Sequence, residues 1–266
     1  MQRYPQLNYN TTVRSVDVVS LDSYPYWHDE SKAKGNLLAA TDTAIHHDMF
    51  RALKKQPFIL MKSTPSSTNR QAVCKLKCPW MHKLACMQAA AHGSDSIQYF
   101  EWRKSQVSNE KFHGSVVDRV GHENTRVFRE VSEVVKTLKK IEDVLATMPR
   151  VRVAVIFDTE NNIALQHLQG FQNENKKYYQ TAYRFYYEFR KRSINVDVIS
   201  ASHDLSSYDL VVAPMSIDVR FDDVASQNGI IKIRIKAKSN LRITLRAIEI
   251  DLKAHPTENV SAEYFK

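Results

Sequence analysis

Residues 57–65 read PFILMKSTP, a short apolar run that ends in a polar turn. The same pattern returns at residues 96–103, which read SIQYFEWR, and the polar segment EKFHG follows at residues 110–114. A buried strand that delivers polar side chains at its C-terminal end is how a (β/α)8 barrel builds an active site. Two such strands in tandem, with a helical segment between them, therefore predict part of a barrel and part of its active-site rim.

The flanking segments continue this alternation of strand and helix. The short β-branched or apolar runs that predict parallel strands are residues 16–21, 57–61 and 96–102. The segments with apolar positions at helical spacing are residues 36–54, 76–92 and 124–148. Residues 1–15 show no periodicity and predict a loop, and Pro149 marks the expected end of a first domain, residues 1–148.

The second half restarts the pattern. Further strands are predicted at residues 151–158, 195–200 and 209–214, and a helix at residues 178–191. Alternating strands and helices imply a second parallel sheet, of the small doubly wound kind. The sequence has no nucleophile elbow and no glycine-rich phosphate loop here, so no chemistry is expected of this domain, residues 149–266. After residue 214, alternation over residues 231–235 and apolar positions within 243–252 predict strands.

Composition limits the classes of function. Hydrophobic residues make up 43% of the 266 residues, enough for a core, and no run of 18 apolar residues predicts a membrane span. The N-terminus lacks the apolar region of a signal peptide, so we expect a cytoplasmic protein. The formal charge of +9 is spread among acidic residues without a nucleic-acid-binding motif. We therefore favour a solvated basic surface over a nucleic-acid interface.

Three cysteines are too few and too clustered for a disulfide framework. Cys74, Cys78, His82 and Cys86 follow one another at four-residue steps, which raises the alternative of a zinc site. Pro79 interrupts the helix that would align them, and ligands spread along one helix do not converge tetrahedrally. We favour small buried residues near a helix start, and expect neither a metal nor a cofactor.

Several ordered segments resemble the β-galactosidases of glycoside hydrolase family 42. They are DSYP at residues 22–25, LM-x-STPS at 60–66, AHG-x-DS at 91–96, YF-x-WR at 99–103, EKFHG at 110–114 and GHE-x-TR at 121–126. The resemblance runs from about residue 16 to about residue 214. It implies the last three strand–helix units of the family's barrel. It also implies a flavodoxin-like, amidotransferase-like domain that mediates trimer formation, divergent after about residue 215.

The resemblance also assigns residues to the site. The family's glutamate nucleophile corresponds to Lys62, and a tryptophan of its pocket corresponds to Arg70. Tyr24, Glu110 and His113 match residues that contact the sugar in the family. The family's acid/base glutamate lies on an earlier strand, upstream of this sequence.

Each of these assignments has a structural alternative. Tyr24 could cap a strand end, Glu110 and His113 could form a loop ion pair, and Lys62 could extend from an open barrel edge into water. For Trp102, which could line the pocket, we favour packing at a strand end.

The identity of residue 62 decides the expected activity. A retaining glycosidase needs two carboxyl groups about 5 Å apart, one of them as nucleophile. A lysine, with an unperturbed pKa of about 10.4, carries a charge that repels the positive charge developing on the sugar ring. We therefore expect a β-galactosidase fragment without turnover, able to bind galactose or a β-galactoside and to form a homotrimer. The alternatives are a non-catalytic sugar-binding or oligomerisation module, and one half of a split enzyme.

Overall fold

The computed structural model describes residues 8–25, 35–69, 74–145, 147–167, 174 and 176–215. The chain divides into units of residues 1–228 and 229–266, and every described residue belongs to the first. The strands predicted over residues 231–235 and 243–252 lie outside the described residues. No described helix is long and apolar enough to cross a membrane.

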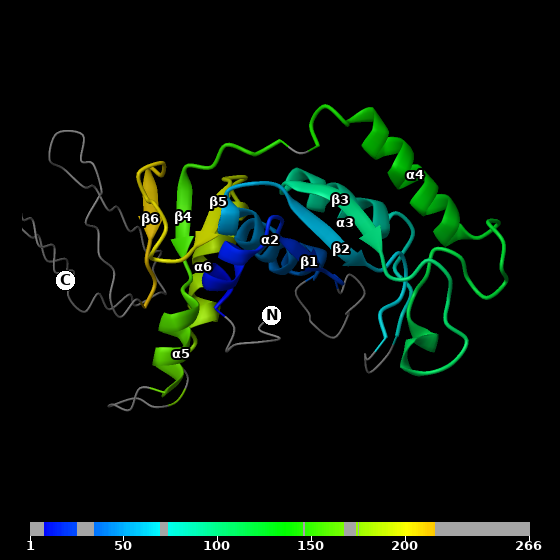
Figure 1. Ribbon diagram of the computed structural model, residues 1–266, viewed down its shortest axis with the longest axis horizontal. Coiled ribbons are helices and arrows are strands. Elements are labelled where there is room, and N and C mark those ends of the chain that lie inside the picture. The colour runs from blue at the N-terminus through cyan, green and yellow to red at the C-terminus, as the bar shows by residue number, and fades with distance from the viewer. Residues whose placement is uncertain are drawn as a thin grey trace, which may run out of the picture. The chain divides into compact units, whose positions relative to one another are not determined.

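Two parallel sheets organise the described residues (Figure 1). The first has the order β1-β2-β3, with β1 at Ser20–Asp22, β2 at Phe58–Ser63 and β3 at Ser94–Tyr99. The second has the order β5-β4-β6, with β4 at Val153–Ile156, β5 at Val196–Ile199 and β6 at Leu210–Val212. This α/β architecture with parallel sheets is consistent with the predicted partial barrel followed by a second parallel-sheet domain.

Helices connect the strands as the alternation predicts. The α-helices are α1 Tyr9–Thr12, α2 Gly35–Lys54, α3 Met81–Ala91, α4 Arg126–Lys140, α5 Thr159–His167 and α6 Tyr178–Arg190. Short 3-10 helices occupy Val13–Ser15 and Asn109–Phe112. The sequence did not predict α1 or α5, because neither shows a clear apolar periodicity.

Two predicted helices are too long, for local reasons. The helix expected to begin at residue 76 begins at Met81, because Pro79 disfavours helical backbone before it and Trp80 adopts a left-handed φ of 68°. The helix expected to reach residue 148 ends at Lys140, and turns follow. Lys139 and Lys140 suit the negative end of the helix dipole, whereas the acidic Glu142 and Asp143 that follow do not.

The first strand is also shorter and later than predicted. Residues 16–21 were expected to be extended, but β1 covers Ser20–Asp22, and Val16 and Val18 stay largely exposed. In the described chain β1 pairs on one side only, with β2, so no second neighbour holds its beginning in a ladder. Among the described residues, β3 likewise pairs only with β2.

Helix α2 packs against strands of both sheets and against α6. Its buried Phe50 packs with Leu21 and Phe58 of the first sheet. Ala44 and Ile45, on the same helix, belong to a core with Val155, Val198 and side chains of α6. The described core therefore runs through α2.

Buried charges accompany this apolar contact. The guanidinium of Arg51 donates hydrogen bonds to the carboxylate of Asp48 and, at 2.6 Å, to that of Asp197 on β5. Asp48 also accepts from the hydroxyl of Tyr186 at 2.5 Å and from Nδ1 of His92 at 2.7 Å. These donors hold the pKa of Asp48 below its ordinary value, against the opposing effect of burial.

Candidate active site and family membership

The C-terminal ends of β1, β2 and β3 lie side by side. The strand register places Asp22 opposite Lys62 and Ser63 opposite Tyr99. Side chains that follow these strand ends are therefore brought together at one edge of the first sheet, where the sequence predicted the rim. We call this group, comprising Asp22, Tyr24, Lys62, Phe100, Glu110 and His113, the strand-end site.

Lys62 sits at this edge between an acid and an aromatic ring. Its Nζ lies 3.6 Å from Oδ2 of Asp22 and 5.4 Å from the ring centroid of Phe100. The side chains of Lys62 and Asp22 are 47% and 38% exposed, so solvent screens much of their attraction. A positive charge thus stands at the end of β2.

Three aromatic rings, of Tyr24, Phe100 and His113, pack together near this charge. His113 makes edge-on contacts with Tyr24, at 5.3 Å between ring centroids, and with Phe100, at 5.1 Å. Burial lowers the pKa of His113, and the nearby Glu110 carboxylate partly offsets this effect. Tyr24 and His113, to which the family resemblance assigned sugar contacts, are therefore neighbours.

Glu110 joins this group through a residue that sequence reasoning missed. The side-chain amide of Asn69 donates to Oε2 of Glu110 at 2.5 Å, and its carbonyl oxygen lies 3.1 Å from Nδ1 of His113. Oε2 of Glu110 lies 3.9 Å from the same Nδ1. Asn69 thus fixes the spacing of the two polar side chains. Its position in the STPSSTN segment, three residues after the end of a matched motif, was the available signal.

Backbone contact between two loops holds the site in place. The N–H of Gly114 donates to the carbonyl of Ser67 at 2.7 Å. A Cβ at position 114 would lie 2.3 Å from Oγ of Ser66 and 2.7 Å from the backbone nitrogen of Ser67, so only glycine fits. This approach explains why glycine follows His113.

A second residue that sequence reasoning did not identify, the buried Lys77, contacts the loop after β2. Nζ of Lys77, a residue with only 1% of its surface exposed, donates to the carbonyl of Thr64. Burial lowers the pKa of Lys77 to about 8, against the opposing effects of Cys86 and Glu130. Arg126 at the start of α4 donates to the carbonyl of Lys77 at 3.0 Å and pairs with Glu130 at 2.7 Å.

With this geometry in view, comparison with known proteins decides the family. The glycoside hydrolase 42 family, described as beta-galactosidase, matches residues 1–141, which is more than half of the chain. The chain belongs to this beta-galactosidase family. A second match, the beta-galactosidase trimerisation domain, covers residues 151–227.

Relatives of this family member are known in sequence and in structure. Beta-galactosidase Pbg of Clostridium perfringens is 50% identical over 208 residues, which are 77% of this chain and 30% of the relative. Beta-galactosidase BglY of Alicyclobacillus acidocaldarius is 46% identical, over 83% of this chain and 32% of the relative. The crystal structure of the beta-galactosidase from Rahnella sp. R3 aligns with a TM-score of 0.73 at 46% identity, over 77% of this chain and 30% of that one. The chain therefore spans about a third of the length of the relatives it matches.

Other predicted residues of this beta-galactosidase family member are placed differently from expectation. Trp102 is 65% exposed, so the favoured packing interpretation is wrong for the described chain. Arg70, at the family's tryptophan position, lies outside the described residues. Cys74 and Cys78 are exposed in the irregular segment before α3, so the expectation of small buried residues is wrong for these two. Cys86 is buried, with Sγ 3.5 Å from Nε2 of His82. The four residues of the zinc alternative therefore do not share one helix.

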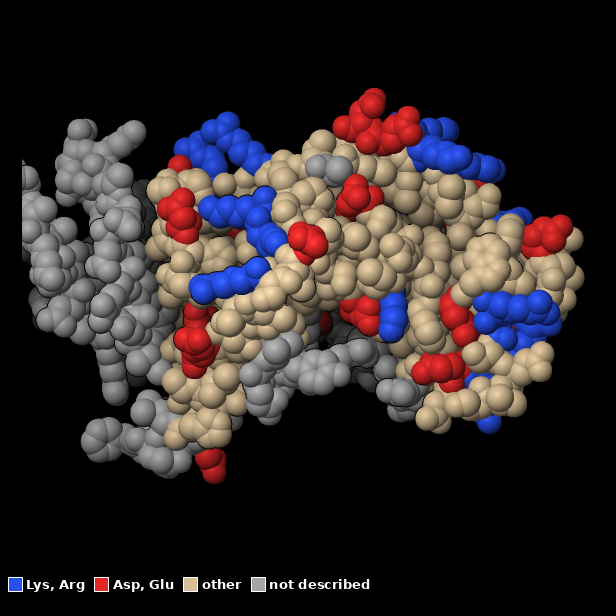
Figure 2. Space-filling view, in the orientation of Figure 1, with Lys and Arg blue, Asp and Glu red and all other residues tan. Residues whose placement is uncertain are grey.

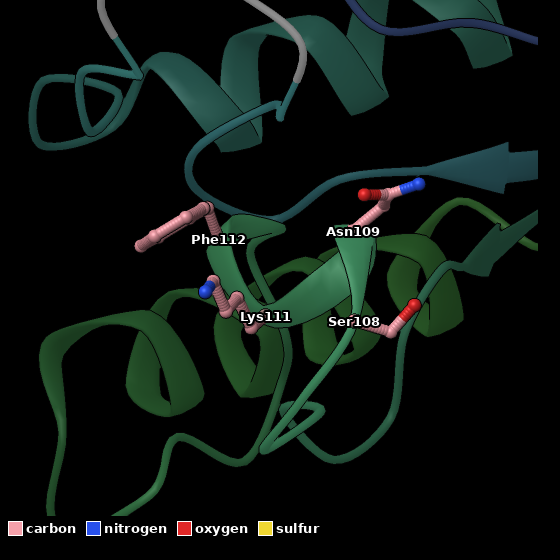
Figure 3. Close-up of a pocket in the computed structure, with 4 residues that line it drawn as sticks. All are labelled: Ser108, Asn109, Lys111 and Phe112. Atoms are coloured by element: carbon pink, nitrogen blue, oxygen red, sulfur yellow. The ribbon is translucent and has the colours of Figure 1, made fainter.

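A surface pocket of about 650 Å3 lies at the short 3-10 helix that contains Glu110 (Figure 3). It is lined by Ser108, Asn109, Lys111 and Phe112, which flank and interleave with Glu110. Nζ of Lys111 lies 5.0 Å from the ring centroid of Phe112, and both side chains project to the same side of the short 3-10 helix. An exposed ring next to hydrogen-bonding groups is a surface on which a sugar face can stack.

Proposed function

We propose that this chain is a beta-galactosidase family protein that binds galactosides at the strand-end site and does not hydrolyse them. The observation that carries the proposal is the cation at the end of β2. Lys62 stands at the position that resemblance assigns to the nucleophile, paired with Asp22 and facing Phe100. Tyr24, Glu110 and His113 supply a ring and hydrogen-bonding groups that suit the hydroxyls of galactose.

Chemistry supports the loss of turnover. The retaining mechanism forms an ester between a carboxylate and the anomeric carbon, and an ammonium has no lone pair to offer. The two carboxylates of the strand-end site, Asp22 and Glu110, interact with Lys62 and with Asn69, respectively. A protonated lysine also places positive charge where the transition state develops positive charge.

The test is the hydrolysis of a chromogenic β-galactoside by complemented proteins. The full chain is purified alone and together with the barrel segment of Clostridium perfringens Pbg that precedes the region of similarity. Wild type, Lys62→Glu and the matched control Lys62→Gln are compared. We expect activity only from Lys62→Glu with the segment. Hydrolysis by the wild-type chain, with residue 62 confirmed as lysine by peptide mass, would overturn the proposal.

A second candidate is one half of a split enzyme. The open sides of β1 and β3 favour it, since each pairs only with β2 in the described chain, and an eight-stranded barrel leaves no strand edge unpaired. In the same assay, turnover by the wild-type chain with the segment would support this candidate. If only Lys62→Glu with the segment shows turnover, the split-enzyme candidate is rejected, and the wild-type chain is left with a binding role alone.

We also propose that residues 149–266 form a domain separate in origin from the barrel part at residues 1–148, and that it assembles three copies. The match to the trimerisation domain supports this. Light scattering on the 30.7 kDa chain tests it, with a mass near three chains expected. A monomer at all concentrations, with no heat of galactose binding, would eliminate both the assembly and the binding role.

A further inference from the structure

The segment that follows β3 builds a small basic pocket. Arg103, Lys104, Gln106 and Arg119 line a depression of about 210 Å3. Three of the four side chains are cations, and none belongs to the strand-end site. Pockets for drug-sized ligands occupy roughly 300–1,000 Å3, so this one suits a small ion or a single charged group.

The backbone brings these side chains together. The N–H of Val117 donates to the carbonyl of Trp102 at 2.7 Å, and the N–H of Lys104 donates to the carbonyl of Val117 at 3.0 Å. Arg103 also forms a parallel bridge with Val117. The segment carrying Arg103 and Lys104 therefore runs beside the one that leads to Arg119.

The guanidinium of Arg119 is anchored through one nitrogen, and its other nitrogens can donate to a ligand. One guanidinium nitrogen donates to the carbonyl of Lys111 at 2.7 Å and to that of Ser105 at 3.4 Å. Within the described part of the chain, the other two guanidinium nitrogens of Arg119 have no hydrogen-bond acceptor. A guanidinium anchored on carbonyls keeps its full positive charge, because carbonyls do not neutralise it.

The neighbouring acids do not balance these charges. Asp118 lies 3.7 Å from Nζ of Lys104 and also accepts from the backbone of Arg119 at 2.6 Å. The carboxylate of Glu101 accepts from both the backbone and the hydroxyl of Ser105, at 2.8 and 2.7 Å. Arg103 pairs with no acid among the described residues. In Figure 2, Lys and Arg side chains form a group at the right of the view, with Asp and Glu side chains beside it, where the segments between β3 and α4 lie.

We propose that this pocket binds a phosphate group, either as inorganic phosphate or as the phosphoryl group of a sugar phosphate. A guanidinium group can donate two parallel hydrogen bonds to two oxygens of one phosphate, and the lysine ammonium adds a point charge. A dianion offsets the repulsion among three neighbouring cations better than a singly charged carboxylate does. Gln106 adds a neutral donor. The proposal is independent of the proposed function, because it uses no residue of the strand-end site.

Calorimetric titration of the full chain with inorganic phosphate, at low ionic strength, tests the pocket. Arg103→Gln removes one charge without removing any hydrogen bond within the described residues. Lys191→Gln, at the exposed C-terminal end of α6, is the matched control. We expect saturable binding to the wild type, about tenfold or more weaker binding to Arg103→Gln, and no change in Lys191→Gln.

Parallel titrations with galactose 6-phosphate and with galactose identify the source of the phosphate. Tighter binding of galactose 6-phosphate than of phosphate assigns a sugar phosphate, whereas equal affinity assigns inorganic phosphate. The absence of saturable heat from both, or an equal loss in Arg103→Gln and Lys191→Gln, would overturn the proposal. Thermal unfolding of each variant checks that the fold is kept. Neither result bears on the hydrolysis assay at Lys62.

Discussion

Single residues hold the loops of the strand-end site at fixed separations. Gly114 allows close contact between two backbone segments, Asn69 bridges Glu110 and His113, and Lys77 donates to the carbonyl of Thr64 after β2. None of these three residues carries the chemistry that the family resemblance assigns to the site. Each instead sets where the chemical groups stand, and two of them can be tested by stability alone.

Gly114→Ala is expected to destabilise the protein by roughly 1–3 kcal/mol, because the added methyl overlaps Ser66 and the backbone of Ser67. Urea unfolding measures the change. Ser66→Ala in the same protein removes the hydroxyl contact but leaves the backbone contact at 2.7 Å. The double variant should therefore stay destabilised, and full recovery would show that the backbone has room to move.

Lys77 predicts a pH dependence of stability. Its folded pKa of about 8 lies below the ordinary value of 10.5, so the unfolded chain binds more protons between these values. The contribution of Lys77 to the free energy of unfolding should therefore rise as pH increases from about 8 to about 10.5.

Lys77→Met removes this titration, and urea unfolding at pH 7.5 and pH 10 measures the difference between the variant and the wild type. We expect the wild type to gain stability relative to the variant, by up to roughly 3 kcal/mol across the window. Buried tyrosines titrate in both proteins and cancel in the comparison. An unchanged difference would mean that water reaches Lys77.

Among the helices, α2 combines two roles. Its apolar side chains fill cores on both sheets, while Asp48 and Arg51 meet Asp197, Tyr186 and His92 in a buried polar network. His92 donates from Nδ1 to Asp48, and its Nε2 lies 3.2 Å from the guanidinium of Arg190. His92 therefore links α2 to Arg190 at the end of α6.

Asp48→Asn should destabilise the protein by about 3–5 kcal/mol, because Arg51 stays buried with one of its two carboxylates lost. Arg51→Met should cost a similar amount, and the double variant should cost less than the sum of the two. Denaturant unfolding completes this double-mutant cycle. The exposed pair of Glu133 and Lys136 is the control, and Glu133→Gln should leave stability unchanged. Additive effects of Asp48→Asn and Arg51→Met would contradict a coupled network.

The periodicity of the sequence located the strands and long helices well, and their ends less well. Apolar runs at 57–61 and 96–102 became β2 and β3 within a few residues, because apolar burial is encoded locally. The end of α4 depended on charges near the helix dipole, to which an apolar period is insensitive. Asn69 and Lys77 escaped prediction because their burial arises from contacts with residues far along the chain. The exposure of Trp102 was also not predicted, because no local sequence pattern indicates that a tryptophan at a strand end is exposed.

On the scale of the whole molecule, the first sheet is open on both sides in the described chain. β1 and β3 each pair only with β2, and Trp80 and Trp102 are more than half exposed. An unpaired strand edge presents rows of backbone donors and acceptors to any strand that can reach them. A polypeptide that supplies further barrel strands would satisfy these groups and cover apolar surface.

The preceding barrel segment of Clostridium perfringens Pbg should therefore raise the unfolding temperature of this chain. A partner that binds only the folded state stabilises it by mass action, so the rise should grow with segment concentration. Scanning calorimetry over a concentration series measures it, with serum albumin at equal mass as the control. A midpoint that does not move would show that the open edges do not accept strands from this source.

The contacts of helix α2 also limit where the chain can be truncated without loss of folding. The first family match ends at residue 141 and the second begins at residue 151, so the matches alone suggest that a truncation between them would preserve the first part. It would strip Arg51 of Asp197 and Asp48 of Tyr186, and would uncover the side of α2 occupied by Ala44 and Ile45. Residues 1–148 expressed by themselves should accumulate in inclusion bodies. The boundary between the two family matches is thus not expected to be a boundary between two independent folding units.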